Sequence, residues 1–284
     1  MFSRDIMPQF RCMVFCHPKT GNTFIRRFIQ LFFLNRVYRQ SGINLSKEDG
    51  IAFCSVGDYS INLPKFERYY RGSYPFLYAH AKPHPVLAEK LAHGKTRVLI
   101  LERNIWDALR SWVDHHRVMA DPAGLGSHQY DGAFDEDTEI AAFLSGRARW
   151  YCEFSADWRR FLIDREEHMM FLDYDSFAAC PRRALEKIRE FWWPKADEPE
   201  FFDIAWKAAN ILREKKRADG KWNDAKFNKG LIGRGHIYRD DPRAVRVSNA
   251  LLSEFEPNIH HLIKFPAPPG EKEKAEMRSP TPTT

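Results

Sequence analysis

A short segment near the start of the sequence combines residue types that bind anions. An apolar run at residues 13–16, typical of a strand, leads into a polar turn, and a helical pattern begins at Phe24. The turn consists of Pro18, Lys19, Thr20, Gly21, Asn22 and Thr23. A strand-to-helix turn directs backbone N–H groups and the positive end of the helix dipole at one point, where an anion is stabilised. Lys19 adds a full charge, and Thr20 and Thr23 add hydroxyl groups. The segment therefore predicts a phosphate-binding turn.

This turn differs from the Walker A loop of P-loop nucleotide kinases. In that loop one glycine lies six residues before the lysine and another lies directly before it. Met13 and Pro18 occupy those two positions here. A nucleotide kinase that prefers ATP with magnesium is therefore kept only as an alternative.

A second strand-to-helix junction carries an arginine and a serine at a suitable spacing for one anion. Residues 97–101 form an apolar, partly β-branched run typical of a buried parallel strand, and a helical stretch covers residues 106–119. Arg103 follows the strand, and Ser111 lies eight residues further on, about two helical turns away. A guanidinium and a hydroxyl placed in this way can reach the same anion.

These residues together resemble a known family. The turn at residues 18–23, followed by Arg103-Asn104, Asp107 and Ser111 at their present spacing, is similar to the sulfotransferases that use 3'-phosphoadenosine 5'-phosphosulfate (PAPS). Two later segments fall in the order that this resemblance requires. They are residues 169–175, which resemble the family's late strand and its Tyr-Glu-Asp motif, and residues 229–233, which resemble the family's C-terminal loop. The likeness extends from about residue 13 to about residue 238.

The resemblance implies a fold and a set of roles. The fold is a P-loop-like three-layer α/β fold with a central parallel sheet flanked by helices. PAPS would be the sulfuryl donor, and the reaction would need no metal. Lys19 and the turn would hold the 5'-phosphate and the bridging oxygen. The other nucleotide contacts implied are Arg103, Ser111, Lys229 and Gly230 on the 3'-phosphate, Phe24 on the adenine, and Tyr174.

The general base is expected shortly after a central strand, because the family often has a histidine there in a Lys-Thr-His sequence. Tyr78-Ala79-His80 matches at His80, with Tyr78 in place of the usual lysine. An unperturbed imidazole has a pKa of about 6.5 and accepts a proton near neutral pH. Lys82 is a possible substitute for the missing lysine, and His84 is the competing base.

Each role has a purely structural alternative. Arg103 could pair with Glu102, Phe24 could be a core residue of its helix, and Tyr174 could simply pack. Asn228 replaces the arginine that the family carries beside the pair equivalent to Lys229-Gly230, which removes one charge from the 3'-phosphate site. A catalytically silent nucleotide-binding protein is the third functional reading.

The composition agrees with a single α/β domain. With 284 residues, 44% of them hydrophobic and 14% aromatic, the chain can bury roughly 75% of its unfolded surface. We expect a sulfotransferase domain at residues 1–265 and a disordered tail at residues 266–284, which are rich in Pro, Gly, Lys, Glu, Ser and Thr. Further helices are expected at 85–93, 136–162 (one or two) and 201–216. A strand is expected at 75–80.

The net charge and the absence of certain motifs indicate which kinds of ligand the chain is expected to bind. A net charge of +6 suits an anionic ligand, and nucleic acid is not expected because zinc-finger spacing and basic-aromatic runs are absent. With no apolar segment of signal or membrane-spanning length, a cytoplasmic protein is expected. The odd number of cysteines, none in CxxC spacing, predicts reduced core thiols. His115-His116 and His260-His261 are expected on helix surfaces.

The acceptor is not specified beyond a hydroxyl or amine on a small molecule or glycan. Two segments are expected to shape its pocket, residues 64–74 and the glycine-containing loop at residues 121–135. Nothing in the sequence specifies an oligomeric state.

Overall fold

The structure is a computed structural model. It describes residues 11–20, 24–25, 28, 51–53, 60–71, 76–92, 96–119, 134–194, 201–203, 205–206 and 232–268. The chain divides into two compact units. The first contains Met1–Glu102 and Glu153–Trp222, and the second contains Arg103–Cys152 and Asn223–Thr284.

The first unit is built on a parallel sheet of five strands in the order β2-β3-β1-β4-β5. The strands are β1 (Arg11–Cys16), β2 (Ile51–Phe53), β3 (Phe76–Ala79), β4 (Thr96–Glu102) and β5 (Met169–Asp173). Residues 12–16 of β1 and 98–102 of β4 are all buried. Parallel strands covered on both faces read as continuous apolar runs rather than as alternating ones, which is why the sequence of both strands predicted them.

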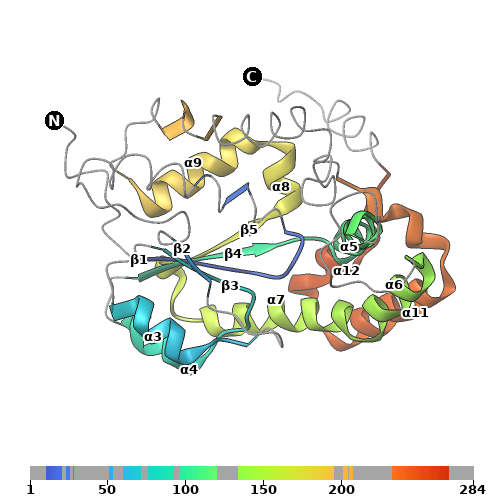
Figure 1. Ribbon diagram of the computed structural model, residues 1–284, viewed down its shortest axis with the longest axis horizontal. Helices are drawn as coiled ribbons and strands as arrows, with labels where there is room; N and C mark the ends of the chain where they lie inside the picture. The colour runs from blue at the N-terminus through green and yellow to red at the C-terminus, as the bar shows by residue number, and fades with distance from the viewer. Residues whose placement is uncertain are drawn as a thin grey trace, which may run out of the picture. The chain divides into compact units, whose positions relative to one another are not determined.

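Helices cover both faces of this sheet (Figure 1). On one face lie α8 (Tyr174–Ala179) and α9 (Pro181–Trp192). On the other lie α3 (Leu63–Arg71), α4 (Pro85–Ala92) and the later part of α7 (Ala148–Leu162). The predicted three-layer α/β fold is confirmed.

Aromatic side chains dominate the packing on both faces of the sheet. On the α9 side, the fully buried Trp192 and Trp193 share a core cluster with Cys16 and other residues of β1 and β4. On the opposite side the rings of Phe15 and Trp158 lie 4.6 Å apart. Large buried rings contribute much of the apolar area that stabilises a domain of this size, so this packing fixes the strand ends that carry the candidate site.

The late strand that the resemblance implied within residues 169–175 is β5. It ends at Asp173, and Tyr174 begins α8. The Asp173 carboxylate accepts a hydrogen bond of 3.0 Å from the backbone N–H of Ser176 and so caps the helix. Tyr174, the tyrosine of the predicted motif, therefore lies in the first turn of α8.

The second unit is helical among its described residues. It holds α5 (Ile105–Met119), α6 (Glu136–Ala142), α11 (Pro242–Glu254), α12 (His260–Ile263) and the 3-10 helices η5 (Arg234–Asp240) and η6 (Pro257–Ile259). The helix expected at 136–162 continues from α6 through a π-helical segment (η3, Phe143–Arg147) into α7. The start of α5 is tied to the C-terminal segment, because the Trp106 ring stacks on Phe265 at 4.5 Å.

Two expectations about burial are wrong, the exposure of His116 and the burial of Cys180. His116 is buried, with 7% of its surface exposed, and its Nδ1 lies 2.6 Å from a Glu139 oxygen that also accepts from Trp112 Nε1 at 3.0 Å. Burial is possible because the carboxylate supplies a partner for the ring nitrogen. Of the predicted core thiols, Cys12, Cys16 and Cys152 are buried and unoxidised, whereas Cys180 is exposed. Burial raises the pKa of the Cys12 thiol.

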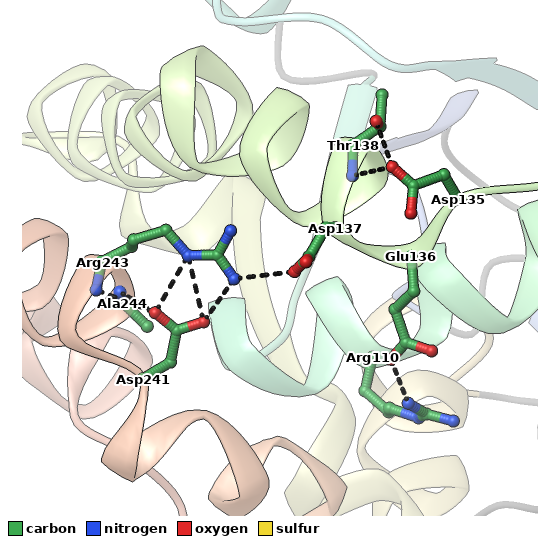
Figure 2. A network of polar contacts seen from close by, with 8 residues as sticks. All are labelled: Arg110, Asp135, Glu136, Asp137, Thr138, Asp241, Arg243 and Ala244. Atoms are coloured by element: carbon green, nitrogen blue, oxygen red, sulfur yellow. Dashed lines mark hydrogen bonds and ion pairs between the residues drawn. The ribbon is translucent and has the colours of Figure 1, made fainter.

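Acidic residues cap two helices of the second unit (Figure 2). Asp135 accepts from the Thr138 backbone N–H at 3.1 Å at the start of α6. Asp241 accepts from the backbone N–H of Arg243 at 2.8 Å at the start of α11, and the Arg243 guanidinium also donates to Asp137 at 3.1 Å. The Arg243 side chain is the main reason that the pKa of Asp241 lies below its ordinary value, against the opposing effect of desolvation.

We expect Asp241→Ala to lower the free energy of unfolding by about 1 kcal/mol near pH 7, because it removes the cap of α11. Asp241→Asn keeps a capping oxygen but not the charge, and should lose less. Because the pKa of the carboxyl is lowered by folding, the charge stabilises above its ordinary pKa of about 3.9, and this contribution is lost as the pH falls through the folded value. Urea unfolding of the wild type and the asparagine variant should therefore converge in acid. A difference in the free energy of unfolding between the wild type and Asp241→Asn that persists in acid would contradict this explanation.

Several predicted segments lie outside the described residues. They are Gly21, Asn22 and Thr23, the loop at 121–133, the later part of the helix expected at 201–216, Lys229-Gly230, Cys54, and the tail from residue 269. In the described ranges, no helix is long and apolar enough to cross a membrane. The boundary at residue 265 stays a prediction.

Candidate active site

The turn after β1 holds its lysine in an unusual backbone conformation. Lys19 has φ = 69°, in the left-handed region that residues with a Cβ seldom adopt. Thr20 is buried, and its hydroxyl donates to the His17 carbonyl at 3.0 Å, which closes the turn. The Thr20 hydroxyl proton is thus used within the turn. A strained residue that is kept at a strand end favours a functional role for that residue.

Phe24 and Tyr174 have structural contacts in the first unit. Phe24 packs against the core cluster, and its ring lies 6.5 Å from Phe28 and 5.2 Å from Phe177. Tyr174 lies 6.4 Å from the same Phe177 ring. These contacts favour the packing role for both rings, and their contact with a nucleotide stays a prediction.

His80 lies beside the end of β1. Its Nδ1 is 2.8 Å from the Cys16 carbonyl oxygen, and its Nε2 is 2.8 Å from the Tyr78 hydroxyl. The proximity follows from the sheet: β1 and β3 pair in parallel with Phe15 opposite Ala79, so the residues that follow meet at the same sheet edge. The predicted phosphate-binding turn begins two residues after Cys16. The structure therefore brings the predicted base close to the end of the strand that leads into this turn.

The two hydrogen bonds determine which nitrogen of His80 carries the proton. A carbonyl oxygen can only accept, so Nδ1 donates to Cys16. In a neutral imidazole Nε2 is then the acceptor. The ring is held in the tautomer that can take up a proton at Nε2, as a general base requires.

His84, the competing base, and Lys82, the substitute for the family's lysine, both have other partners. His84 precedes α4, and its Nδ1 accepts from the Val86 backbone N–H at 3.2 Å, as a helix cap does. Lys82 forms ion pairs with Glu153 and Asp157, the second at 3.6 Å. A lysine paired with two carboxylates is a weak substitute for the family's lysine, because its charge is already compensated.

In the second unit, Arg103 and Ser111 are both buried, with 2% and 4% of their surfaces exposed. Between them Asn104 caps α5, because its side-chain oxygen accepts from the Trp106 backbone N–H at 3.0 Å. The suggested pairing of Arg103 with Glu102 is not needed to satisfy that carboxylate. Within the first unit Glu102 is bound by both guanidinium nitrogens of Arg159, one at 2.7 Å.

Asp107 anchors the segment that follows the predicted 3'-phosphate loop. Its buried carboxylate accepts from the backbone N–H groups of Gly233, at 2.9 Å, and Gly235, at 2.6 Å. Gly233 has φ = 79°, and a Cβ on Gly235 would lie 2.3 Å from the Trp106 backbone carbon. Both glycines are therefore required for this close approach. Lys229 and Gly230 immediately precede the anchored segment.

We expect Asp107→Ala to weaken the binding of 3',5'-adenosine bisphosphate at least about tenfold, because two buried N–H groups lose their acceptor and the loop loses its anchor. Isothermal calorimetry of the purified variant measures this. Asp137→Ala, which removes a largely exposed carboxylate from the same unit, is the matched control and should bind as the wild type does. Unchanged affinity in a folded Asp107→Ala variant would contradict the anchoring role.

The sequence overlooked three contributors to this geometry. The Cys16 carbonyl and the Asp107 carboxylate act through contacts between distant segments, whereas the Tyr78 hydroxyl contacts a residue two positions further along the chain. The one local signal was the spacing of Tyr78 and His80, which places both on the same face of an extended chain. In the part of the chain that the structure describes, no group of three or more metal-ligating side chains was found.

Comparisons with known proteins identify the family and the fold of this chain. A family model described as a sulfotransferase domain matches residues 11–226. A search of curated proteins found no match. Among solved structures, the chain is similar to mouse sulfotransferase SULT7A1 complexed with PAP, with 16% identity and a TM-score of 0.61 over 97% of this chain and 94% of that one.

The chain is also similar to two structures of retinol dehydratase. One is in complex with androsterone and the inactive cofactor PAP, with 14% identity and a TM-score of 0.53 over 89% of this chain and 84% of that one. The other is in complex with retinol and PAP, with 14% identity and a TM-score of 0.52 over 87% and 82% of the two chains. At these identities the structural likeness establishes the fold.

Proposed function

The chain belongs to the sulfotransferase family and is a PAPS-dependent sulfotransferase, and we propose that it uses His80 to deprotonate a hydroxyl or amine acceptor. The products are the sulfated acceptor and 3',5'-adenosine bisphosphate. The observation that carries this assignment is the tautomer of His80, which presents an unprotonated Nε2 beside the strand that leads into the Lys19 turn.

The two ends of the reaction make different demands on the chain. The acceptor must lose a proton as it attacks sulfur in line with the leaving phosphate, and that phosphate gains negative charge as the S–O bond breaks. His80 meets the first demand. Lys19 meets the second with its ammonium group, together with the backbone N–H groups of the turn.

We assign the 3'-phosphate of PAPS to Arg103, Ser111, Lys229 and Gly230. The burial of Arg103 and Ser111 supports this, because a charged hydrogen bond is stronger where water is scarce. Thr20, Gly21, Asn22 and Thr23 are assigned to the 5'-phosphate side, with Phe24 and Tyr174 as nucleotide contacts. The reaction written in this way uses no metal, since Lys19 supplies the positive charge.

We further propose a small-molecule acceptor. Androsterone and retinol, which are bound in the similar retinol dehydratase structures, are apolar molecules with oxygen groups, and a glycan is the alternative. We propose a cytoplasmic location and no nucleic-acid partner. The comparisons lend no support to a nucleotide kinase.

A screen with sulfur-labelled PAPS tests the proposal. The panel contains four acceptor classes, a phenol, an aliphatic alcohol, an amine and a saccharide. Each acceptor is paired with a matched compound that lacks the reacting group. We expect label transfer to at least one hydroxyl or amine acceptor, with equimolar release of the bisphosphate. Binding of PAPS without transfer to any class would favour the silent nucleotide-binding protein instead.

A further inference from the structure

We propose that the acceptor's proton reaches His80 through the hydroxyl of Tyr78, so that the base of this enzyme is a tyrosine–histidine pair. The proposal rests on the proposed function, because it takes His80 as the group that finally holds the proton. It adds a residue that stands where the family resemblance predicts a lysine.

The hydrogen bonds around the pair run in one direction. Cys16 Sγ donates to the Tyr78 hydroxyl oxygen at 3.4 Å. The Tyr78 hydroxyl lies 2.8 Å from His80 Nε2, and His80 Nδ1 donates to the Cys16 carbonyl at 2.8 Å. Because Nε2 has no proton in this tautomer, the Tyr78 hydroxyl is the donor in the middle bond.

The lone pair of the base is therefore already occupied. Nε2 of a neutral imidazole has one lone pair in the ring plane, so an acceptor hydroxyl can use it directly only after Tyr78 or His80 has moved. Tyr78 has 2% of its surface exposed, belongs to the core cluster and sits on β3, which is paired on both sides. A movement of His80 would break its bond to Cys16. Relay through the Tyr78 hydroxyl keeps both hydrogen bonds in place, and it requires that the bound acceptor oxygen reaches the Tyr78 hydroxyl.

The relay balances as one step. The acceptor oxygen forms its bond to sulfur, and the S–O bond to the departing 5'-phosphate breaks. The acceptor's O–H proton moves to the Tyr78 oxygen while the Tyr78 proton moves to His80 Nε2, which leaves an imidazolium and an unchanged tyrosine. The imidazolium later releases its proton to solvent.

Tyr78→Phe tests the relay, because it keeps the ring and removes only the hydroxyl. With the best acceptor from the screen, we expect its single-turnover rate to fall at least about a hundredfold, the lower end of the range for general acid–base groups. Affinity for 3',5'-adenosine bisphosphate and the unfolding midpoint should stay close to wild type, which shows that the variant is folded. His80→Ala is run in parallel.

A proton inventory gives a readout that a packing role would not change. For the wild type, a plot of single-turnover rate against the deuterium fraction of the solvent should be curved, because two protons move together. For Tyr78→Phe, the same plot of the residual rate should be a straight line. A Tyr78→Phe rate within about twofold of wild type, or a linear inventory in the wild type, would overturn the relay. If His80→Ala were inactive while Tyr78→Phe stayed active, the proposed role of His80 would stand and the relay would be overturned. An active His80→Ala variant would overturn both the relay and the proposed role of His80.

Discussion

Lys19→Gly should lower the rate of sulfuryl transfer by about a hundredfold to a thousandfold without destabilising the protein. The loss follows from the role we propose for Lys19, whose ammonium group would stabilise the charge that develops on the leaving phosphate; preorganised electrostatic groups have effects of that size. Stability should hold because Lys19 lies at φ = 69°, a conformation that glycine adopts without a steric penalty. The transfer rate and the urea unfolding curve are the two measurements.

Lys19→Ala is the matched control for Lys19→Gly. Alanine also removes the charge but keeps the Cβ in the left-handed region, so it should be as inactive as glycine and less stable by about 1 kcal/mol. Lys19→Arg keeps a charge and should retain more activity than either. If the glycine variant kept wild-type turnover, the turn would have only a structural role.

His80→Ala should reduce transfer by about a hundredfold to ten-thousandfold while leaving nucleotide affinity unchanged, because general base catalysis is lost and no nucleotide contact is removed. Added imidazole should restore part of the rate by occupying the vacated space as a base. Single-turnover transfer with and without imidazole is the measurement.

His84→Ala is the control for the base assignment. Its Nδ1 caps α4, so the variant should lose some stability but keep its turnover. The reverse pattern, an active His80→Ala with an inactive His84→Ala, would move the base to His84 and remove the basis for the tyrosine relay as well.

Most of the sheet could be predicted from the sequence because β1, β3 and β4 are distinct apolar runs, whereas β2, with three residues, was not among the expected strands. β1 and β4 are buried on both faces, and each is followed by a polar turn and a helix, which made the parallel α/β arrangement readable. The end of β5 could not be predicted in the same way. It is determined by the Asp173 side chain, which caps α8 by accepting a hydrogen bond from the Ser176 backbone N–H.

The site was predictable only where its residues act locally. The Lys19 turn was proposed from its place between a strand and a helix, and His80 was proposed from the resemblance to the family; both roles stay predictions. The Asp107 carboxylate binds backbone groups 126 and 128 residues away, and no spacing rule contains that pairing. The burial of His116 depends in the same way on Glu139, which belongs to another helix. Long-range contacts of polar groups determine such details, and they leave no periodic signal in a single sequence.

The most direct test of the account is calorimetric binding of three nucleotides to the wild type and to Arg103→Ala. We predict that 3',5'-adenosine bisphosphate binds the wild type much more tightly than 5'-AMP or magnesium-ATP, and that Arg103→Ala reduces its affinity to about that of 5'-AMP, because the 3'-phosphate loses its charged partner. A preference for magnesium-ATP, or bisphosphate binding that does not depend on Arg103, would contradict the proposed nucleotide site.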